Sequence, residues 1–482
     1  MKSIVFSDIN NFYYLYSFKK REMLSITNVL YDICNLYLNY DFSLSQIKKE
    51  LHSKYIKQDL MEGCNDFEYF NKHGYLDTIE RSRIISYIPP ASIEQRKSNI
   101  KVITFELTQK CNLECTYCVY GDLYSNTENN HKRDLSFEKA KATIDYFAKQ
   151  INKGNSTRRV ITLGFYGGEP LLKFKLIKQI VEYSKSLENK DLSFEYTITT
   201  NGILLNKYID FIVDNDFITL ISLDGDKFAS SYRITSKGEN CFDHIYANIK
   251  SLSDKYPQYF KYRVTFNSVL HNRNSCLSTM KFIKDNFNKF PLISTLSNVS
   301  INPMNKEQFK ETYKSLLNDI DLHKSEIPND YYVRISPKML LVDKFFANIL
   351  GSKIMSLHTL FCTEMSKDYI PSATCSPFSF KIFLSSDGYL YPCEKVGYKY
   401  PLGCVNDNNQ LIIDDKAISK SYSLLYNSVK NECAKCYNLF SCTTCLFETH
   451  AKCNYVSREQ FVELISDYVN TCNEKRQLKA LI

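Results

Sequence analysis

The sequence predicts an α/β protein centred on a partial barrel of six βα units. Between residues 101 and 310, short segments rich in apolar and β-branched residues alternate with longer amphipathic segments. Turn motifs with glycine or asparagine follow several predicted strands, and a loop with three cysteines follows the first. Such alternation favours parallel strands, whose carboxyl ends meet at one edge. We therefore expect the turn motifs and the cysteine loop to share that edge.

The barrel is expected to occupy residues 91–310. Each unit combines a strand of β-branched and aromatic residues with a helix of 3.6-residue periodicity. Together the units predict an α/β fold, a partial (βα)6 TIM-like barrel. The predicted strands span 102–108, 160–166, 194–200, 217–223, 262–269 and 297–303, and the helical segments span 136–151, 172–187, 206–215, 243–255 and 276–287.

Residues 1–90 predict a winged-helix-like module in front of the barrel. Two short strands, at 4–6 and 12–16, form a hairpin signal, and three small helices follow. Ser43 with Gln46 three residues later matches a capping box at the start of the second helix. The first helix is expected over 25–36 and the third from Asp66 to near Gly74, and residues 87–100, with Pro89 and Pro90, resemble a linker.

Two functions are open for this N-terminal module. A DNA-binding winged helix would need a basic third helix, yet Asp66 and Glu68 make that segment acidic, which is poor for phosphate contact. An extended peptide can instead add to an exposed strand edge through main-chain hydrogen bonds. We therefore expect residues 1–90 to recognise a peptide.

The chain after the barrel divides into a helical bridge, residues 311–361, and a cysteine-rich end, residues 362–482. Helical stretches are expected at 305–322 and 338–350, and a hairpin is expected from Phe380–Leu384 and Tyr389–Tyr391 around Ser385–Gly388.

Composition limits the classes of function. The chain has 61 Lys and Arg against 53 Asp and Glu, a formal net charge of +8, but no basic block. This gives no argument for nucleic acid and only weak support for an acidic peptide partner. The N-terminus lacks an apolar signal region, and no apolar run approaches a membrane span, so we expect a cytoplasmic protein with no membrane segment. In a reducing compartment, 17 cysteines indicate metal ligands more than disulfides.

Cys111, Cys115 and Cys118 form a C-x3-C-x2-C loop after the first predicted barrel strand. A short loop can turn three thiolates toward one metal centre. Three ligands suit a 4Fe–4S cluster, because the fourth iron then stays open to a non-protein ligand. The alternatives are a zinc loop, which usually has four ligands and C-x2-C pairs, or three unrelated buried thiols.

Further motifs follow the next three predicted strands. Gly167-Gly168-Glu169-Pro170 permits a close backbone approach and supplies a carboxylate that can hold a ligand ammonium group. Thr199–Gly202 and Ser222–Gly225 follow the third and fourth strands, with Arg233 shortly after. Each motif alone is more often an ordinary turn. Their placement at successive strand ends indicates a shared site.

The cysteine loop with Tyr117, followed by the Gly-Gly-Glu-Pro, Thr-Thr-Asn-Gly and Ser-Leu-Asp-Gly motifs, resembles the radical S-adenosylmethionine (radical SAM) enzymes over about residues 100–310. The resemblance implies that the three cysteines hold a 4Fe–4S cluster whose open iron binds S-adenosylmethionine. An electron from the cluster then cleaves a C–S bond, and the resulting 5′-deoxyadenosyl radical takes a hydrogen atom from the substrate. The implied cofactor-binding residues are Tyr117, against the adenine; Gly167, Gly168 and Glu169, facing the methionyl ammonium; Asn201; and Ser222 and Arg233, near the carboxylate or ribose.

The C-terminal cysteines resemble the SPASM domain, which holds two auxiliary 4Fe–4S clusters, although a hairpin with C-x2-C pairs by itself also suits a zinc ribbon. The chain departs from that family's pattern at one step, because two residues separate Cys442 from Cys445 where three are usual. The resemblance assigns Cys433, Cys436, Cys442 and Cys453 to an outer cluster, and Cys375, Cys393, Cys445 and Cys362 to an inner cluster, which gives three clusters with that of the barrel.

Glu394 directly follows Cys393, at the position where anaerobic sulfatase-maturing enzymes carry a proton-accepting Asp. A Glu can also accept a proton, and a Glu-Lys-Val ending resembles peptide cross-linking maturases, which often carry a leader-recognition module. The resemblance implies a maturase that installs a thioether or C–C cross-link in a ribosomal precursor peptide with a leader. It would take electrons from a low-potential donor such as flavodoxin or ferredoxin. The alternatives are a formylglycine-forming enzyme of the sulfatase-maturing type, and a non-catalytic iron–sulfur or zinc scaffold that binds peptides or DNA.

Overall fold

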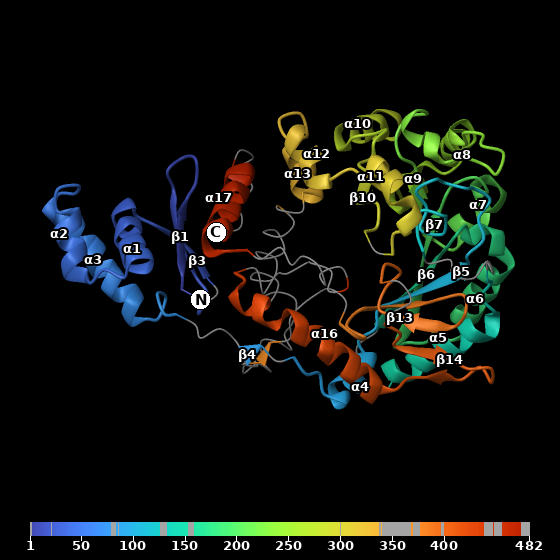
Figure 1. The fold of residues 1–482 in the computed structure, drawn as a ribbon, viewed down its shortest axis with the longest axis horizontal. Helices are drawn as coiled ribbons and strands as arrows, with labels where there is room; N and C mark the ends of the chain where they lie inside the picture. The colour runs from blue at the N-terminus through green and yellow to red at the C-terminus, as the bar shows by residue number, and fades with distance from the viewer. Residues whose placement is uncertain are drawn as a thin grey trace.

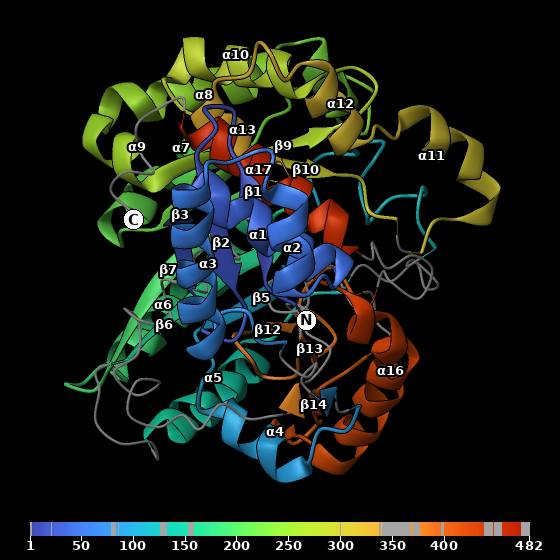
Figure 2. The same cartoon turned by 90° about the vertical axis from the view of Figure 1, so that its left-hand side faces the viewer.

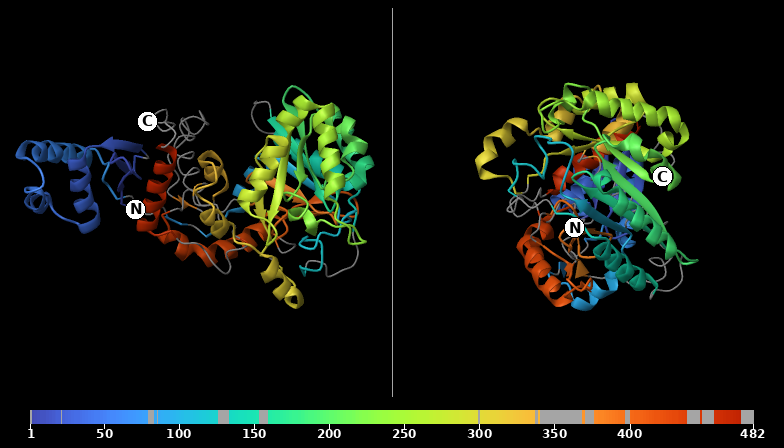
Figure 3. Two further views of the ribbon diagram at one scale, coloured as in Figure 1. Left: turned by 90° about the horizontal axis from the view of Figure 1, so that it is seen from above. Right: turned by 90° about the vertical axis from the view of Figure 1, so that its right-hand side faces the viewer.

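The protein is elongated, with a small N-terminal module at one end and an α/β barrel at the other (Figures 1 and 3). Two C-terminal helices, α16 (Asp415–Lys435) and α17 (Arg458–Asn473), lie between them (Figure 1). The computed structural model describes residues 2–20, 22–78, 83–84, 86–125, 133–152, 159–298, 300–336, 339, 368–369, 376–396, 400–437, 447 and 456–473.

Six consecutive parallel strands form the barrel sheet, in the order β10-β9-β8-β7-β6-β5. This arrangement confirms the predicted α/β fold with a large parallel sheet, and the first five strands begin and end within two residues of the predicted bounds. The strands are β5 (Val102–Thr108), β6 (Arg159–Gly167), β7 (Leu192–Thr200), β8 (Ile218–Ser222), β9 (Val264–Leu270) and β10 (Leu292–Thr295).

The prediction for the sixth strand was wrong. The segment 297–303 was expected to pair, but the strand is Leu292–Thr295, and it lies parallel to Asn267–Leu270 of β9. Ile301 instead makes a single bridge to Tyr124, on the loop that follows the cysteines. Both segments are short and mix apolar with polar residues, so local composition could not decide which of them reaches the edge of the sheet.

Helices cover one face of the barrel sheet, and their apolar faces pack on Ile103, Phe105, Leu163 and Phe165. These side chains alternate along β5 and β6 with the residues of the opposite, more polar face. The helices are α5 (Phe137–Asn152), α6 (Phe174–Ser186), α7 (Leu205–Asp214), α8 (Phe242–Lys255) and α10 (Cys276–Phe287), as predicted within two residues, and the short α9 (Pro257–Arg263), which was not predicted.

The predicted C-terminal hairpin is present, and it extends the barrel sheet. Its first strand, β12 (Lys381–Leu384), lies parallel to β5, with Phe383 opposite Thr104. The second, β13 (Tyr389–Tyr391), pairs antiparallel with β12. Two more antiparallel strands, β14 (Gly403–Val405) and β15 (Leu411–Ile412), complete a ten-stranded sheet. The barrel and the hairpin therefore share one sheet and one apolar core.

The N-terminal module is a three-stranded antiparallel sheet with helices on one face (Figure 2). The hairpin and the Ser43–Gln46 capping box are both confirmed. The third helix begins at Lys57, not at Asp66, and a third strand was missed. The elements are β1 (Ile4–Ser7), β2 (Tyr13–Ser17), β3 (Glu22–Ile26), α1 (Asn28–Tyr40), α2 (Leu44–Leu51) and α3 (Lys57–Lys72).

The other face of this small sheet packs on α17. Phe18 lies 5.8 Å from the ring of Tyr437 and 6.2 Å from that of Phe461. Asn470 accepts a hydrogen bond of 2.6 Å from the backbone of Ile9. The C-terminal helix therefore fixes the module, and α17 contacts β1 at one edge of the sheet. The opposite edge strand, β3, pairs only with β2 in the described part of the chain.

The segment 87–100 is not a simple linker, which corrects the prediction. It forms α4 (Pro90–Lys97), a helix with proline in its first turn that packs along α16. Lys97 is buried and pairs with Asp415 of α16 at 2.8 Å. A buried lysine requires such a partner, so this contact anchors the segment. Nearby, β4 (Arg83–Ile84) pairs in parallel with β11 (Asp368–Tyr369).

The expected helical bridge is described as far as Ser336, with Met339. It consists of short helices, and most of the predicted stretch 338–350 lies outside the described residues. No helix in the described ranges is long and apolar enough to cross a membrane. The bridge elements are η3 (Pro303–Asn305), α11 (Lys306–Thr312), α12 (Leu316–Leu322) and α13 (Asn329–Ile335).

Candidate active site

The three cysteines of the loop lie where β5 ends. The backbone amide of Leu113 and the Asn201 side chain donate hydrogen bonds to Cys111 Sγ, at 3.4 and 3.5 Å. Burial raises the pKa of the Cys111 thiol to about 11 and that of Cys115 to about 12, and the neighbouring thiols of the loop act in the same direction. Thiols this buried ionise when a metal replaces the proton.

The donor set suits an iron–sulfur cluster. No three metal-ligating side chains in the described ranges come close enough together to hold a single metal ion. A 4Fe–4S cluster binds each thiolate to a different iron, so its ligands surround a wider space. That requirement is met by Cys111, Cys115 and Cys118. Their thiols are close enough to raise one another's pKa, but they do not converge on one point.

Gly167 and Gly168 hold the cysteine loop by direct backbone contact. Gly167 has a φ of +129°, and a Cβ there would lie 2.2 Å from the Thr108 carbonyl oxygen. A Cβ on Gly168 would lie 2.3 Å from the Lys110 carbonyl oxygen. The amides of Gly168 and Glu169 donate to these carbonyls at 2.8 and 3.0 Å. The close approach that the motif predicts is therefore made, in part, to the chain's own segment before Cys111.

Glu169 is fully buried beside this contact. One carboxylate oxygen accepts from the Leu171 amide at 3.0 Å and the Thr200 hydroxyl at 2.9 Å, and the other accepts from the Asn201 amide at 2.8 Å. All three donors are uncharged. Burial raises the pKa of Glu169 to about 7, and these hydrogen bonds only partly oppose the rise. The carboxylate therefore lies in a place that favours a cationic ligand.

Asn201 connects Glu169 to the cysteine loop. Its side-chain amide donates to Asn112 at 2.8 Å as well as to Cys111, while its backbone binds Glu169. The structure thus brings together the ends of β5, β6 and β7, as the sequence predicted. Ser222 ends β8, opposite Asn267 of β9, at the same edge of the sheet.

A second buried carboxylate, Asp224, lies on the other side of the loop. Arg233 donates two hydrogen bonds to it, at 2.8 and 2.9 Å, and the Tyr117 hydroxyl donates a third at 2.5 Å. Burial alone would raise the pKa of Asp224, but the charge of Arg233 and the hydrogen bonds lower it well below its usual range. Sequence reasoning noted Asp224 only as part of a turn motif. The sequence signal for the pair was the short separation of nine residues between Asp224 and Arg233.

Tyr117 is buried in this network. Its ring stacks on His271 at 5.5 Å and meets Tyr232 edge-on at 6.1 Å. The Nδ1 atom of His271 accepts from the Arg273 amide at 3.1 Å, which leaves Nε2 to carry the proton, 3.7 Å from Asp224. His271, which sequence reasoning missed, therefore supports Tyr117 and Asp224 from the position directly after β9.

Glu394 lies at the polar face of the barrel sheet. Its carboxylate pairs with Lys381 of β12 at 2.6 Å. Burial opposes ionisation, but the charge and hydrogen bond of Lys381 lower the pKa of Glu394. Burial raises the pKa of Tyr166. The nearby groups Glu394, Cys118 and Glu106 raise this pKa further. Tyr166 was not predicted as a site residue.

Only part of the auxiliary cysteine set is described. Cys393 follows β13, and the Cys436 amide donates to the Cys433 carbonyl at 3.2 Å where α16 ends. The helix end thus places this C-x2-C pair on one turn. The predicted ligands Cys362, Cys375, Cys442, Cys445 and Cys453 lie outside the described residues.

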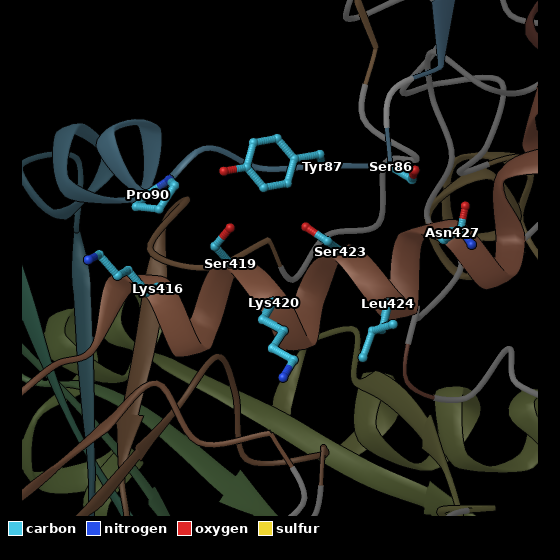
Figure 4. Close-up of a pocket in the computed structure, with 9 residues that line it drawn as sticks. All are labelled: Ser86, Tyr87, Pro90, Lys416, Ser419, Lys420, Ser423, Leu424 and Asn427. Carbon is cyan, nitrogen blue, oxygen red and sulfur yellow. The ribbon is translucent and has the colours of Figure 1, made fainter.

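A shallow surface depression of about 620 Å³ lies elsewhere, between α16 and the segment before α4 (Figure 4). It is lined by Tyr87, Pro90, Leu424 and polar side chains of α16, including Lys416 and Lys420. None of the predicted cofactor-binding or metal-binding residues lines it.

Comparison with known proteins gives consistent results. Residues 105–283 match the family model described as the radical SAM superfamily. Over 347 residues the chain is 26% identical to a cysteine-type anaerobic sulfatase-maturating enzyme of Clostridium novyi (strain NT), covering 69% of this chain and 82% of that protein. Over 264 residues it is 26% identical to the radical SAM cyclopropyl synthase TigE of Paramaledivibacter caminithermalis, covering 52% of each.

The fold has a solved counterpart. The structure described as "Native anSMEcpe with bound AdoMet" aligns with a TM-score of 0.52 at 20% identity, over 78% of this chain and 97% of that chain. The family match begins in β5 and ends in α10, so it contains the cysteine loop, Glu169 and the Asp224 network.

Proposed function

Because residues 105–283 form a radical SAM domain in a chain homologous to the anaerobic sulfatase-maturating enzymes, we propose that this enzyme is a maturase of a ribosomally made precursor peptide. The bound cluster and S-adenosylmethionine, which the family implies, would supply a 5′-deoxyadenosyl radical that takes a hydrogen atom from the peptide. The reaction proposed is closure of a thioether or C–C cross-link. The single observation that carries the proposal is the cysteine loop set between two buried carboxylates: within the described residues, Asp224 pairs with an arginine and Glu169 accepts only from uncharged donors.

The described residues fit the proposed cofactors. Cys111, Cys115 and Cys118 would hold the cluster. S-adenosylmethionine carries an ammonium and a sulfonium, and Glu169 is a buried carboxylate whose donors are all uncharged. A cationic ligand beside it would recover the cost of burying the charge. Gly167 and Gly168, packed on the backbone before Cys111, would face the ligand's methionyl end through their main chain.

The remaining cofactor contacts follow from the same edge of the sheet. The hydrogen bonds of Arg233 to Asp224 use Nε and Nη2, so a contact with the ligand's carboxylate or ribose would fall to Nη1. Ser222 and Asn201 would add neutral hydrogen bonds there. Tyr117 would reach the adenine with the part of its ring that His271 and Tyr232 leave uncovered.

The peptide would lie on the polar face of the barrel, between the cysteine loop and the C-terminal hairpin. Glu394, held by Lys381, would accept a proton from the reacting residue. Cys433 and Cys436, with Cys442 and Cys453, would bind an outer auxiliary cluster, and Cys393, with Cys375, Cys445 and Cys362, an inner one. The inner cluster would take the last electron, because Cys393 is adjacent to Glu394.

The N-terminal module would hold the leader of the precursor on the open edge of β3. A strand added there would pair through main-chain hydrogen bonds. Proline at Leu24 or at Ser25 tests this, because consecutive amides of a strand point to opposite sides. One variant should lose binding of a fluorescent leader peptide, and the other should disturb the pairing with β2. Equal binding by both would contradict the proposal.

A second function has its own support. The relative from Clostridium novyi aligns with 69% of this chain and is named as a sulfatase-maturating enzyme. Formation of formylglycine from a cysteine is therefore the alternative reaction. Against this reaction count Glu394, which stands where that family carries an Asp, and the additional N-terminal module. A non-catalytic scaffold is not favoured, because the matched domain is that of an enzyme family.

The experiment uses anaerobically reconstituted full-length protein, dithionite, S-adenosylmethionine and the short peptides encoded in neighbouring open reading frames. We expect 5′-deoxyadenosine, abolished by Cys115→Ala, and a peptide that has lost two hydrogen atoms without gaining an aldehyde. An aldehyde that reacts with a hydrazine probe would show the formylglycine reaction instead. About 12 irons per chain would fit three clusters and about 8 would fit two. No 5′-deoxyadenosine with any peptide would overturn the proposal.

A further inference from the structure

Glu106 is a buried carboxylate that neither the motifs nor the proposed chemistry use. It lies on β5, three positions before Gln109, and it is 1% exposed. One oxygen accepts from the Tyr120 hydroxyl at 2.7 Å. The other accepts from the amide and the hydroxyl of Ser386, at 2.9 and 2.8 Å, and from the Gln109 side chain at 3.5 Å. All four donors are uncharged groups.

The two closest partners of Glu106, Tyr120 and Ser386, belong to segments that lie far apart in the sequence. Tyr120 follows Cys118 by two residues, on the loop of the first cluster. Ser386 is in the turn between β12 and β13, and β13 leads directly into Cys393 and Glu394. The turn is further held by Lys139, which donates to the Asp387 carbonyl at 2.8 Å.

The chemistry of this contact is specific. Burial of a carboxylate is costly unless hydrogen bonds satisfy it, and an apolar side chain would join the same strands at lower cost. A carboxylate instead requires donors at fixed directions on each oxygen. Because Tyr120 binds one oxygen and Ser386 binds the other, the position of the loop and the position of the turn are each defined relative to Glu106.

We propose that Glu106 is a positioning residue that couples the loop of the radical-generating cluster to the hairpin that presents Cys393 and Glu394. The inference rests on the proposed function, in which hydrogen is removed near the loop and the proton and electron are taken up at the hairpin. Glu106 sets the spacing of these two groups across the polar face of the sheet. The contact is made by Tyr120 on one side and Ser386 on the other.

Hydrogen–deuterium exchange of the full-length protein tests the coupling without any substrate. The monitored amides are those of Cys118 and Gly121 on the loop, and that of Gly388 in the turn, each of which is hydrogen-bonded. Ser386→Ala removes one hydrogen bond to a charged group, so opening of the turn should rise about tenfold. The decisive expectation is that exchange at Cys118 and Gly121 also rises, by about threefold, although the hydrogen bonds of Ser386 within the described residues go to Glu106 and not to the loop.

Tyr120→Phe should give the reciprocal effect on Gly388, and the double variant should exchange no faster than the more affected single variant, because both act through one carboxylate. Ser421→Ala, which removes a hydroxyl bonded within α16, is the matched control and should leave both segments unchanged. These conservative variants test whether Glu106 couples the loop to the turn, even if the Glu106→Gln protein fails to fold. Changes confined to the mutated segment, or additive changes, would overturn the proposal.

A second readout separates this inference from the proposed function. In reconstituted protein, Ser386→Ala should keep its iron content and its formation of 5′-deoxyadenosine, but change the EPR power saturation of the reduced loop cluster, which senses its distance from a neighbouring cluster. Unchanged saturation with altered exchange would limit Glu106 to a structural role and overturn the inference. If the protein generates no 5′-deoxyadenosine, the proposed function fails, while the exchange result still decides whether Glu106 couples the two segments.

Discussion

Glu169 and Asp224 are both fully buried carboxylates at the carboxyl edge of the same sheet, yet their surroundings drive their pKa values in opposite directions. Asp224 has Arg233 as a charged partner and lies on the side of the loop that Tyr117 covers. Glu169 has only uncharged donors among the described residues, and it lies beside the Gly167–Gly168 contact.

This difference indicates that the two carboxylates have different roles at the edge of the sheet. The charge of Asp224 is neutralised by Arg233 of the chain, so Asp224 itself serves to hold Tyr117 and Arg233 in place. In the proposed function, a cationic ligand would complete the Glu169 side. The two carboxylates, similar in sequence context, thus form a structural half and a binding half of the proposed site.

The largest effect should come from breaking the structural half. Asp224→Ala leaves the Arg233 guanidinium buried and unpaired, which typically destabilises a protein by about 3 to 5 kcal/mol. Urea unfolding followed by circular dichroism measures it. The control is Asp243→Ala, which removes an exposed pair with Lys227 and should change little. Equal effects of both substitutions would remove the distinction between the two carboxylates.

The stability that Glu169 contributes should depend on pH. The pKa of Glu169 is raised from 4.5 to about 7 in the folded, ligand-free protein, so the folded state holds its proton more tightly than the unfolded state. The resulting stability is present below about pH 4.5 and is lost as pH rises through 7, by up to about 3 kcal/mol. Glu169→Gln should lack this loss, as measured by unfolding at pH 5 and pH 8. A parallel dependence in both proteins would contradict the assignment.

The affinity for S-adenosylmethionine should also distinguish the roles of Glu169 and Asp224. Glu169→Gln removes the charge that faces the ligand's ammonium, so binding to the reconstituted protein should weaken about tenfold to a hundredfold, as expected for a hydrogen bond between charged groups. Equilibrium dialysis measures it. In the wild type, affinity should rise as pH increases through 7, because ligand binding requires the ionised carboxylate. A Glu169→Gln protein that binds as tightly as the wild type would refute the proposed role.

The smallest change concerns a single hydroxyl of the structural half. Tyr117→Phe removes one of the donors to Asp224 but keeps the ring stacked on His271 and leaves the Arg233 pair intact. We expect a loss of about 1.5 kcal/mol in unfolding free energy, with the affinity for S-adenosylmethionine nearly unchanged. A large loss of affinity would instead place the hydroxyl in the binding half.

Local patterns in the sequence determined much of this architecture. Helical periodicity placed five barrel helices within two residues, and the Ser43–Gln46 pair located a helix start, because neighbouring residues alone decide these features. The order of motifs after successive strands also predicted which residues gather at one edge, since parallel strands bring their carboxyl ends together.

Only the tertiary structure decided the partners of the buried charges. The sequence did not indicate that Glu106 reaches Ser386, which is 280 residues away, or that Lys97 of the expected linker pairs with Asp415. The parallel register of β12 on β5 makes the first contact possible, and the packing of α4 on α16 makes the second. The tertiary structure also decided that Leu292–Thr295, and not the predicted segment 297–303, forms the sixth strand. Pairing between distant segments depends on register and burial, which local composition does not encode.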